Sequence, residues 1–237
     1  MNCLSDLVNL SLICADPLNI EDDLSFLSER GIKKIHLDVM DSMFVPRFGI
    51  FPEIAKELTE RLDFQFDAHF MVSDVLSGIS EWCKYQIPSK ISFHYQHNKK
   101  DISEIASSIR NQQSDCLLAY DLTVSDDEFI QSIEFYKPDG IMLLGIVPGV
   151  LVQEHKPNEV IRKLELLNHH NFNFIKHIMI DGGVNFKTVP IYAAMGCTDL
   201  VCGSSTIYHN VDFKNSHLKK ELLSKNIQLL RELIEHV

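Results

Sequence analysis

Residues 33–49 read KKIHLDVMDSMFVPRFG, and here a strand-like apolar segment carries ionisable side chains. The pattern of apolar residues predicts a buried strand over residues 33–40. His36, Asp38 and Asp41 lie in that strand or directly after it, where a core favours aliphatic side chains. Side chains alternate along a strand, so His36 and Asp38 point to the same face. The stretch therefore predicts a strand that contributes polar groups to a functional site.

Short apolar runs alternate with amphipathic segments on both sides of this stretch. Further strands are expected at residues 7–15, 64–72, 90–95, 116–122, 140–146, 174–180 and 198–204. Helices are expected at residues 20–31, 51–62, 75–85, 101–112, 125–136, 158–170, 185–196 and, as a long charged helix, 211–236. Strict strand–helix alternation predicts parallel strands joined by crossover helices.

Eight such units in a chain of 237 residues predict a single α/β domain over residues 1–237, a closed (β/α)8 TIM barrel with the C-terminal helix 211–236. Barrels of this kind typically need about 200 residues or more. An open doubly wound sheet is the alternative, although eight equal units exceed what most such sheets carry. The final helix is expected to pack outside the barrel. A homo-oligomer that uses this helix is compatible with the sequence.

The composition argues against several classes of function. Asp and Glu number 33 against 22 Lys and Arg, which gives a net charge of -11. No basic cluster of the kind that nucleic acid requires is present, whereas a small anionic substrate is compatible because a local pocket can be positive. No apolar run is long enough for a membrane span, and the N-terminal residues do not resemble a signal peptide. The six cysteines form no CxxC pair, so we expect reduced thiols in a cytoplasmic protein.

In a TIM barrel the active site lies at the carboxyl ends of the strands. Polar residues at such ends are His36 and Asp38, Asp67 and His69, and Asp181. Carboxylates in a dry interior repel one another, and a cation would neutralise them. His36, Asp38, His69 and Asp181 combine imidazole and carboxylate donors that suit one divalent ion, namely zinc, iron(II), manganese or cobalt. Any one of these residues alone is more simply explained as a polar residue at a strand end that hydrogen-bonds to loop amides. The four together favour a metal site.

Several longer motifs resemble the ribulose-phosphate 3-epimerase family. The stretch LSLICAD is similar to PSILSAD in that family, HLDVMDSMFVPR to HxDVMDGxFVPN, DAHFM to DxHLM, IDGG to VDGG and VCGSS to a late xxGS turn. The second motif is long and specific, and the resemblance extends from Leu10 to about Tyr208. It implies a barrel of the ribulose-phosphate-binding type and an isomerase of carbohydrate metabolism in the pentose phosphate pathway.

The resemblance also implies roles for individual residues. Asp38 and Asp181 would form the acid–base pair, and they would bind the metal together with His36 and His69. Positions that match substrate-binding positions of the family are Ser11, Met40, His69, Met71, Gly149, Gly182, Gly183, Gly203 and Ser204. The turns DGGVN and CGSS each precede an expected helix, so their backbone N–H groups would hold a substrate phosphate.

The implied reaction is 3-epimerisation of a ketose phosphate, from D-ribulose 5-phosphate to D-xylulose 5-phosphate, through a cis-enediolate. Two carboxylates on opposite sides of the sugar would exchange the roles of base and acid. One divalent metal would stabilise the charge on the substrate oxygens. A Schiff-base aldolase is the enzyme alternative, but the lysines near predicted strands lie at strand beginnings, the wrong end of the barrel: Lys33, Lys34, Lys90 and Lys176.

The loop after the sixth strand departs from the family pattern. The family reads roughly MTVNPGFGGQ, whereas this chain reads LGIVPGVLVQ, with Leu151 and Val152 in place of paired glycines. Branched side chains keep a backbone farther from an anion and disfavour positive φ. Arg47 replaces an Asn of the family and is either a new positive contact or a solvated surface cation. Alternatives are therefore another keto-sugar, such as allulose 6-phosphate, or a non-catalytic sugar-phosphate-binding relic.

Overall fold

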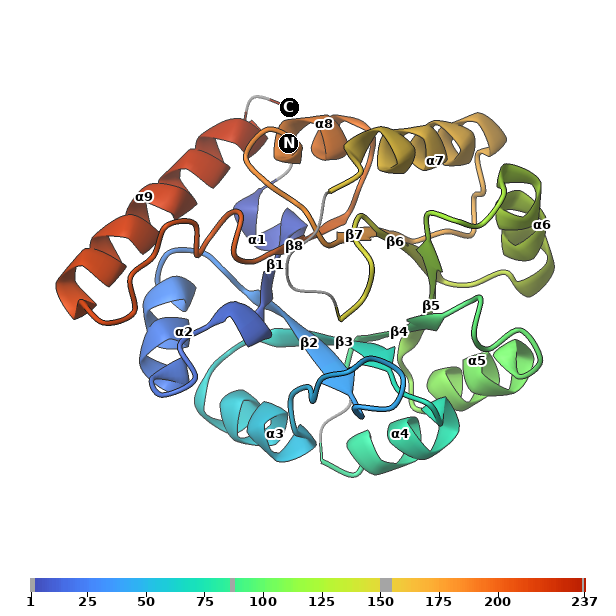
Figure 1. The fold of residues 1–237 in the computed structure, drawn as a ribbon, viewed down its shortest axis with the longest axis horizontal. Helices are drawn as coiled ribbons and strands as arrows, with labels where there is room; N and C mark the ends of the chain where they lie inside the picture. The colour runs from blue at the N-terminus through green and yellow to red at the C-terminus, as the bar shows by residue number, and fades with distance from the viewer. Residues whose placement is uncertain (1–2, 86–87, 150–154, 236) are drawn as a thin grey trace.

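The computed structural model describes residues 3–85, 88–149, 155–235 and 237. A closed barrel of parallel strands in sequence order forms its centre (Figure 1). The strands are β1 (Val8–Ser11), β2 (Lys34–Met40), β3 (Gln65–Met71), β4 (Lys90–His94), β5 (Asp115–Asp121), β6 (Gly140–Leu144), β7 (His177–Asp181) and β8 (Asp199–Cys202). Because β1 pairs in parallel with both β2 and β8, the sheet has no free edge. The predicted fold class, a (β/α)8 TIM barrel, is confirmed.

The helices form a ring outside the barrel (Figure 1). They are α2 (Ile20–Ser28), α3 (Pro52–Arg61), α4 (Val75–Trp82), α5 (Ile102–Asn111), α6 (Asp126–Tyr136), α7 (Pro157–His170), α8 (Val189–Ala194) and α9 (Ser216–Glu235), with a short α1 (Leu4–Leu7) before β1. In α5 the buried residues include Ile102, Ile105 and Ile109, a helical spacing that turns one apolar stripe toward the strands. Among the described residues, no helix is long and apolar enough to cross a membrane.

Several boundaries differ from the expectations drawn from the sequence, and two of them have a clear local cause. The strand expected at residues 7–15 ends at Ser11, and Leu12–Cys14 form a 3-10 turn, closed by a hydrogen bond from Ala15 N–H to the Leu12 carbonyl (3.0 Å). Apolar residues continue through that turn, so hydrophobicity alone could not separate the two. The helix expected from residue 211 begins at Ser216, because the Asn215 side chain accepts a hydrogen bond from the Leu218 N–H (3.1 Å) and caps it there.

The strand register brings the polar strand ends to one level. Across β2 and β3, His36 is opposite Asp67 and Asp38 is opposite His69. On the other side of the barrel, Asp181 ends β7 beside Leu144 of β6. Parallel strands all direct their carboxyl ends to the same mouth, and these residues therefore gather there.

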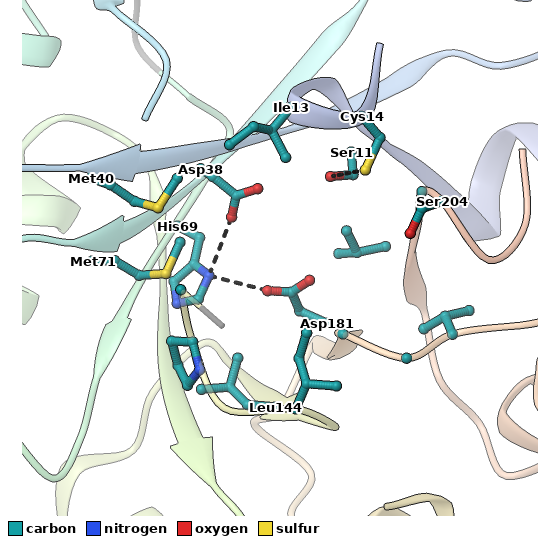
Figure 2. Close-up of a pocket in the computed structure, with 18 of the residues that line it drawn as sticks. Ser11, Ile13, Cys14, Asp38, Met40, His69, Met71, Leu144, Asp181 and Ser204 are labelled. Atoms are coloured by element: carbon teal, nitrogen blue, oxygen red, sulfur yellow. Dashed lines mark hydrogen bonds and ion pairs between the residues drawn. The ribbon is translucent and has the colours of Figure 1, made fainter. Parts of the chain in front are cut away.

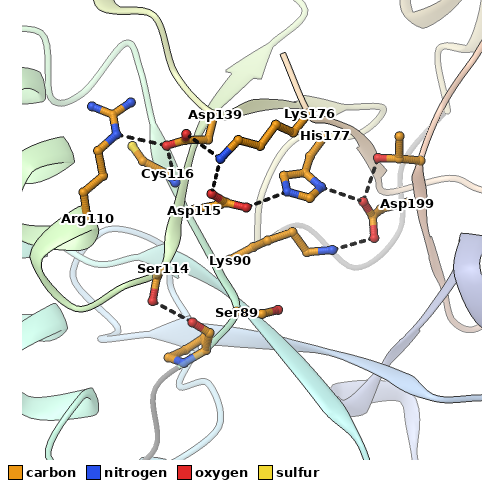
Figure 3. Close-up of polar contacts among 12 residues, drawn as sticks. Ser89, Lys90, Arg110, Ser114, Asp115, Cys116, Asp139, Lys176, His177 and Asp199 are labelled. Carbon is orange, nitrogen blue, oxygen red and sulfur yellow. Dashed lines mark hydrogen bonds and ion pairs between the residues drawn. The ribbon is translucent and has the colours of Figure 1, made fainter. Parts of the chain in front are cut away.

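The opposite end of the barrel is closed by paired charges (Figure 3). Asp199, at the start of β8, is 1% exposed and accepts hydrogen bonds from Lys34 (3.0 Å) and Lys90 (2.6 Å). Lys176 forms ion pairs with Asp115 and Asp139 at the same end. These lysines are held by carboxylates far from the mouth, which agrees with the argument against a Schiff-base aldolase.

Candidate active site

Four side chains meet at the mouth of the barrel: His36 and Asp38 from β2, His69 from β3 and Asp181 from β7. One ligand atom of each lies within 4.8 Å of the others. His69 Nδ1 lies 3.2 Å from Asp181 Oδ2 and 3.9 Å from Asp38 Oδ1 (Figure 2). His36 Nε2 lies 3.6 Å from Asp38 Oδ1. The structure thus brings together the four residues for which the sequence predicts a metal site.

Two imidazole nitrogens in this cluster lack a hydrogen-bond partner among the described residues. His36 Nε2 and His69 Nδ1 are buried, and neither makes a hydrogen bond to any residue that the structure describes. A buried polar atom left without a partner costs about 1–3 kcal/mol. Both nitrogens face the two carboxylates, so together the groups present two nitrogen and two oxygen donors. Such a set suits zinc or a divalent transition metal, and the residues present fit one divalent ion.

Asp67 and His94 support the cluster, and sequence reasoning assigned neither to the site. Asp67 makes a hydrogen bond to Nδ1 of His36, and His94 Nε2 lies 2.9 Å from His69 Nε2. Each contact engages the ring nitrogen that faces away from the carboxylates, and such contacts fix the tautomer and orientation of metal-binding histidines. The alternation of side chains in DAHFM did indicate that Asp67 faces the interior, but not what it contacts.

Charges at the cluster shift two of its pKa values. Burial alone would lower the pKa of His36, but Asp67, Asp38 and Asp181 outweigh it and raise that pKa well above its usual value. Burial alone would raise the pKa of Asp181, whereas contact with His69 and the charge of His36 outweigh it, so this pKa is lowered. Asp181 is therefore ionised at neutral pH and available as a proton acceptor.

His94 contacts the Nε2 side of the His69 ring. Burial, followed by the nearby His69 and His97, lowers the pKa of His94 well below its usual value, so His94 is neutral. A neutral His94 can accept a hydrogen bond at Nε2 from the Nε2–H tautomer of His69 (2.9 Å). In that tautomer the lone pair of His69 Nδ1 would face Asp38 and Asp181 and be available to a metal ion.

The cluster opens into a cavity of about 200 Å³. Its lining contains every position for which the sequence predicts substrate binding: Ser11, Met40, His69, Met71, Gly149, Gly182, Gly183, Gly203 and Ser204. Figure 2 shows Ser11 and Ser204 on one side, with Met40 and Met71 beside His69. His36 lies behind the wall with no exposed surface. Drug-sized ligands occupy about 300–1,000 Å³, so this cavity suits a smaller molecule.

Two glycine turns form part of the cavity wall. Gly182 and Gly183 have φ values of 84° and 73°, and a Cβ on Gly183 would lie 2.0 Å from Cδ2 of His155. Glycine alone meets both conditions without strain. The expectation that each turn leads into a helix is wrong: α8 begins only at Val189, and after β8 the next helix among the described residues is α9. The backbone N–H groups at these turns therefore lack the field of an adjoining helix.

The chain matches the model of the ribulose-phosphate 3-epimerase family over residues 7–208. The chain belongs to that family. The ribulose-phosphate 3-epimerase of Methanocaldococcus jannaschii is 25% identical over 213 residues, which cover 88% of this chain and 87% of the relative. That of Chlamydia pneumoniae is 27% identical over 206 residues, which cover 84% and 87%. The predicted membership and the predicted enzyme class, an isomerase, are confirmed.

A solved structure of similar fold is the 3-hexulose-6-phosphate synthase from Salmonella typhimurium. It matches with a TM-score of 0.70 at 13% identity, over 97% of this chain and 99% of that chain. At this identity the match shows the barrel fold and carries no argument about activity.

The β6 loop of this epimerase family member is described only in part. Leu151 and Val152, the residues that depart from the family pattern, lie outside the described residues. Before them, Gly149 has a φ of 75°, and a Cβ there would lie 2.7 Å from Cβ of Val45. The start of this loop therefore packs directly on the loop between β2 and α3, and both border the cavity.

Proposed function

We propose that this chain is a metal-dependent ketose-phosphate 3-epimerase that interconverts D-ribulose 5-phosphate and D-xylulose 5-phosphate. The observation that carries the proposal is the position of Asp38 and Asp181. They extend from two different strands into one cavity, beside His69 (Figure 2). Inverting a carbon next to a ketone requires a proton acceptor on one face of the sugar and a donor on the other.

The two aspartates supply these groups. Asp181 is ionised at neutral pH because of the nearby histidines, and so accepts the C3 proton from its side of the sugar. In this direction Asp38, from β2, must start protonated and gives its proton to C3 on the opposite face. Catalysis in the reverse direction exchanges the two roles. Positioned acid–base groups of this kind contribute about 10²–10⁴-fold each to the rate.

A divalent ion fits the same four residues. His36, Asp38, His69 and Asp181 would hold it, with Zn, Fe(II), Mn and Co all suited to the donors. When bound, such an ion supplies Lewis-acid stabilisation of the negative charge that develops on the substrate oxygens. Met40 and Met71 pack with Val45 in a small apolar cluster beside the site, and this wall excludes water from the reacting carbon.

A ketohexose phosphate such as allulose 6-phosphate is the second candidate substrate. It is favoured by the changed sequence of the β6 loop, where Leu151 and Val152 replace the glycines of the family pattern. Its chemistry at C3 would use the same two aspartates. A non-catalytic relic is disfavoured, because without a bound ion the buried nitrogens of His36 and His69 would stay without a hydrogen bond. All six cysteines are free thiols, which supports the cytoplasmic location expected from the sequence.

Incorporation of deuterium at C3 tests the proposal. D-ribulose 5-phosphate, allulose 6-phosphate and the free ketoses are incubated in D2O with the protein and Mn, Zn or Fe(II). We expect exchange into D-ribulose 5-phosphate and a loss of at least about 100-fold in Asp38→Asn and in Asp181→Asn. The exposed Asp63 supplies the control, Asp63→Asn, which should retain full exchange. Absence of exchange in every ketose phosphate, or full exchange in Asp181→Asn, would contradict the proposal.

A further inference from the structure

Arg47 differs from every other arginine in the described part of the chain. It lies half-buried in the loop between β2 and α3 and lines the cavity. Its side chain makes no hydrogen bond or ion pair with any described residue. The other arginines each bind an acceptor: Arg30, Arg61, Arg110, Arg162 and Arg231. A half-buried guanidinium has five N–H donors to satisfy, and the residue that carries them here borders the cavity.

The loop that carries Arg47 is fixed to the strand of the site. The Arg47 carbonyl accepts a hydrogen bond from the Ser42 N–H (3.0 Å), and the Ile50 N–H donates to the Asp38 carbonyl (2.9 Å). Asp41 accepts hydrogen bonds from two further N–H groups within the loop (2.8 Å each). The backbone at Arg47 is therefore held in place relative to Asp38, which limits the conformational entropy lost when its side chain binds a ligand.

The charge of the cavity explains why a phosphate would need a positive side chain there. Among the described residues that line it, Arg47 is the only lysine or arginine, while Asp38 and Asp181 are acids. The whole chain carries a net charge of -11, so an approaching phosphate is repelled at long range. The turns at Gly182 and Ser204 offer backbone N–H groups without an adjoining helix. Partial charges on a few N–H groups are a weak counterion for a dianion.

We propose that Arg47 binds the phosphate of the substrate and makes the enzyme prefer phosphorylated over neutral ketoses. This inference rests on the proposed function and names the residue that selects its substrate class. A guanidinium binds phosphate through two parallel N–H···O bonds, which adds both energy and orientation. The phosphate would lie between Arg47 and the glycine turns, and the sugar would extend from there toward Asp38 and Asp181.

Calorimetric titration of the metal-loaded protein with inorganic phosphate tests this directly. A hydrogen-bonded charge pair is worth about 10- to 100-fold in affinity, so Arg47→Gln should weaken phosphate binding by that factor. Arg47→Lys keeps the charge and should lie between the two. The matched control is Arg61→Gln, which removes the same charge from the outer surface of α3, where Arg61 contacts Glu21 and Glu57. That control should bind phosphate as tightly as the unmodified chain.

Steady-state kinetics gives a second measurement. Arg47→Gln should raise KM for the ketose phosphate by about 10- to 100-fold and leave kcat within about threefold, because the contact exists equally in ground state and transition state. The ratio of kcat/KM for phosphorylated over neutral ketose should fall accordingly. A fall in kcat at constant KM would place Arg47 in proton transfer and overturn the inference.

The outcomes separate this inference from the function on which it rests. Failure of the unmodified chain to exchange C3 hydrogen in any ketose phosphate contradicts the proposed function, and the phosphate titration still decides the role of Arg47. An active enzyme whose Arg47→Gln variant binds phosphate as tightly as the unmodified chain contradicts the Arg47 inference alone. An unmodified chain that binds no phosphate also overturns it. Circular dichroism of each variant verifies that the barrel is intact.

Discussion

The imidazole rings of His36 and His69 lie 5.9 Å apart between centroids, and each turns a buried nitrogen that makes no hydrogen bond toward the same two carboxylates, Asp38 and Asp181. A cation bound between the four groups would interact with both nitrogens and both carboxylates. We therefore expect His69→Gln, which removes one nitrogen donor, to bind Zn²⁺ or Mn²⁺ at least about tenfold more weakly than the unmodified chain. Elemental analysis after dialysis against a chelator measures the difference.

The control for this prediction is a histidine far from the cluster. His217 is exposed on α9, so His217→Gln should retain the same metal content as the unmodified chain. Equal metal retention by His69→Gln and His217→Gln would show that the buried nitrogens do not bind an ion.

We expect Asp67 to support a bound metal through its hydrogen bond to His36, and its replacement tests that role. Asp67→Asn keeps the shape of the side chain but removes the charge that faces Nδ1 of His36. Loss of such an orienting carboxylate typically costs about 10- to 100-fold in metal affinity. A competition titration with a chromogenic chelator measures the affinity, and excess metal should restore kcat. Asp63→Asn is the control, and an unchanged affinity in Asp67→Asn would exclude the orienting role.

The four candidate ligands could be predicted because they depend only on the period of two along a strand and on the rule that parallel strands share one mouth. His94 could not, since its contact with His69 depends on the stagger between β3 and β4, where His69 pairs with Ser92. That stagger is set by the closure of the whole barrel and leaves no local signal in the sequence.

Loops were less predictable than strands, because their positions also depend on contacts that leave no local signal in the sequence. The sequence left Arg47 open between a surface cation and a pocket residue. Its position follows from hydrogen bonds between the loop and β2, such as that from Ile50 to Asp38, and these are not visible in the residue types. The prediction of helices directly after the glycine turns was wrong. A glycine pair marks a turn but does not indicate where the next helix begins.

Gly183 should tolerate a side chain less well than Gly196, although both have positive φ, 73° and 87°. A Cβ at Gly183 would lie 2.0 Å from Cδ2 of His155, whereas at Gly196 it would meet nothing within 4 Å. Gly196→Ala should therefore cost about 1–2 kcal/mol from backbone strain alone, and Gly183→Ala about 1–3 kcal/mol more from overpacking. Denaturant unfolding measures both free energies.

The double variant Gly183→Ala/His155→Ala separates strain from collision. Measured against His155→Ala alone, the double variant should lose only the cost of positive φ, because the collision with the imidazole is gone. If Gly183→Ala is no less stable than Gly196→Ala, the contact with His155 does not restrict this turn.

Asp199 should make the stability of the barrel depend on pH. Burial by itself raises the pKa of this carboxyl, but Lys90 and Lys34 outweigh it and the pKa is lowered. Because the folded pKa lies below the unfolded value of about 3.9, the contribution is complete above that value and is lost as the pH falls through the folded pKa. Asp199→Asn leaves two lysines uncompensated and should cost about 3–5 kcal/mol at pH 7.

Urea unfolding between pH 7 and pH 3 measures this dependence. The difference in free energy of unfolding between the unmodified chain and Asp199→Asn should be constant at neutral pH and shrink below about pH 4, because the protonated Asp199 no longer pairs with Lys90 (Figure 3). The exposed Asp22 gives the control, and Asp22→Asn should follow the unmodified chain at every pH. A difference for Asp199→Asn that stays the same down to pH 3, or that is absent at pH 7, would mean that this ion pair does not stabilise the closed end of the barrel.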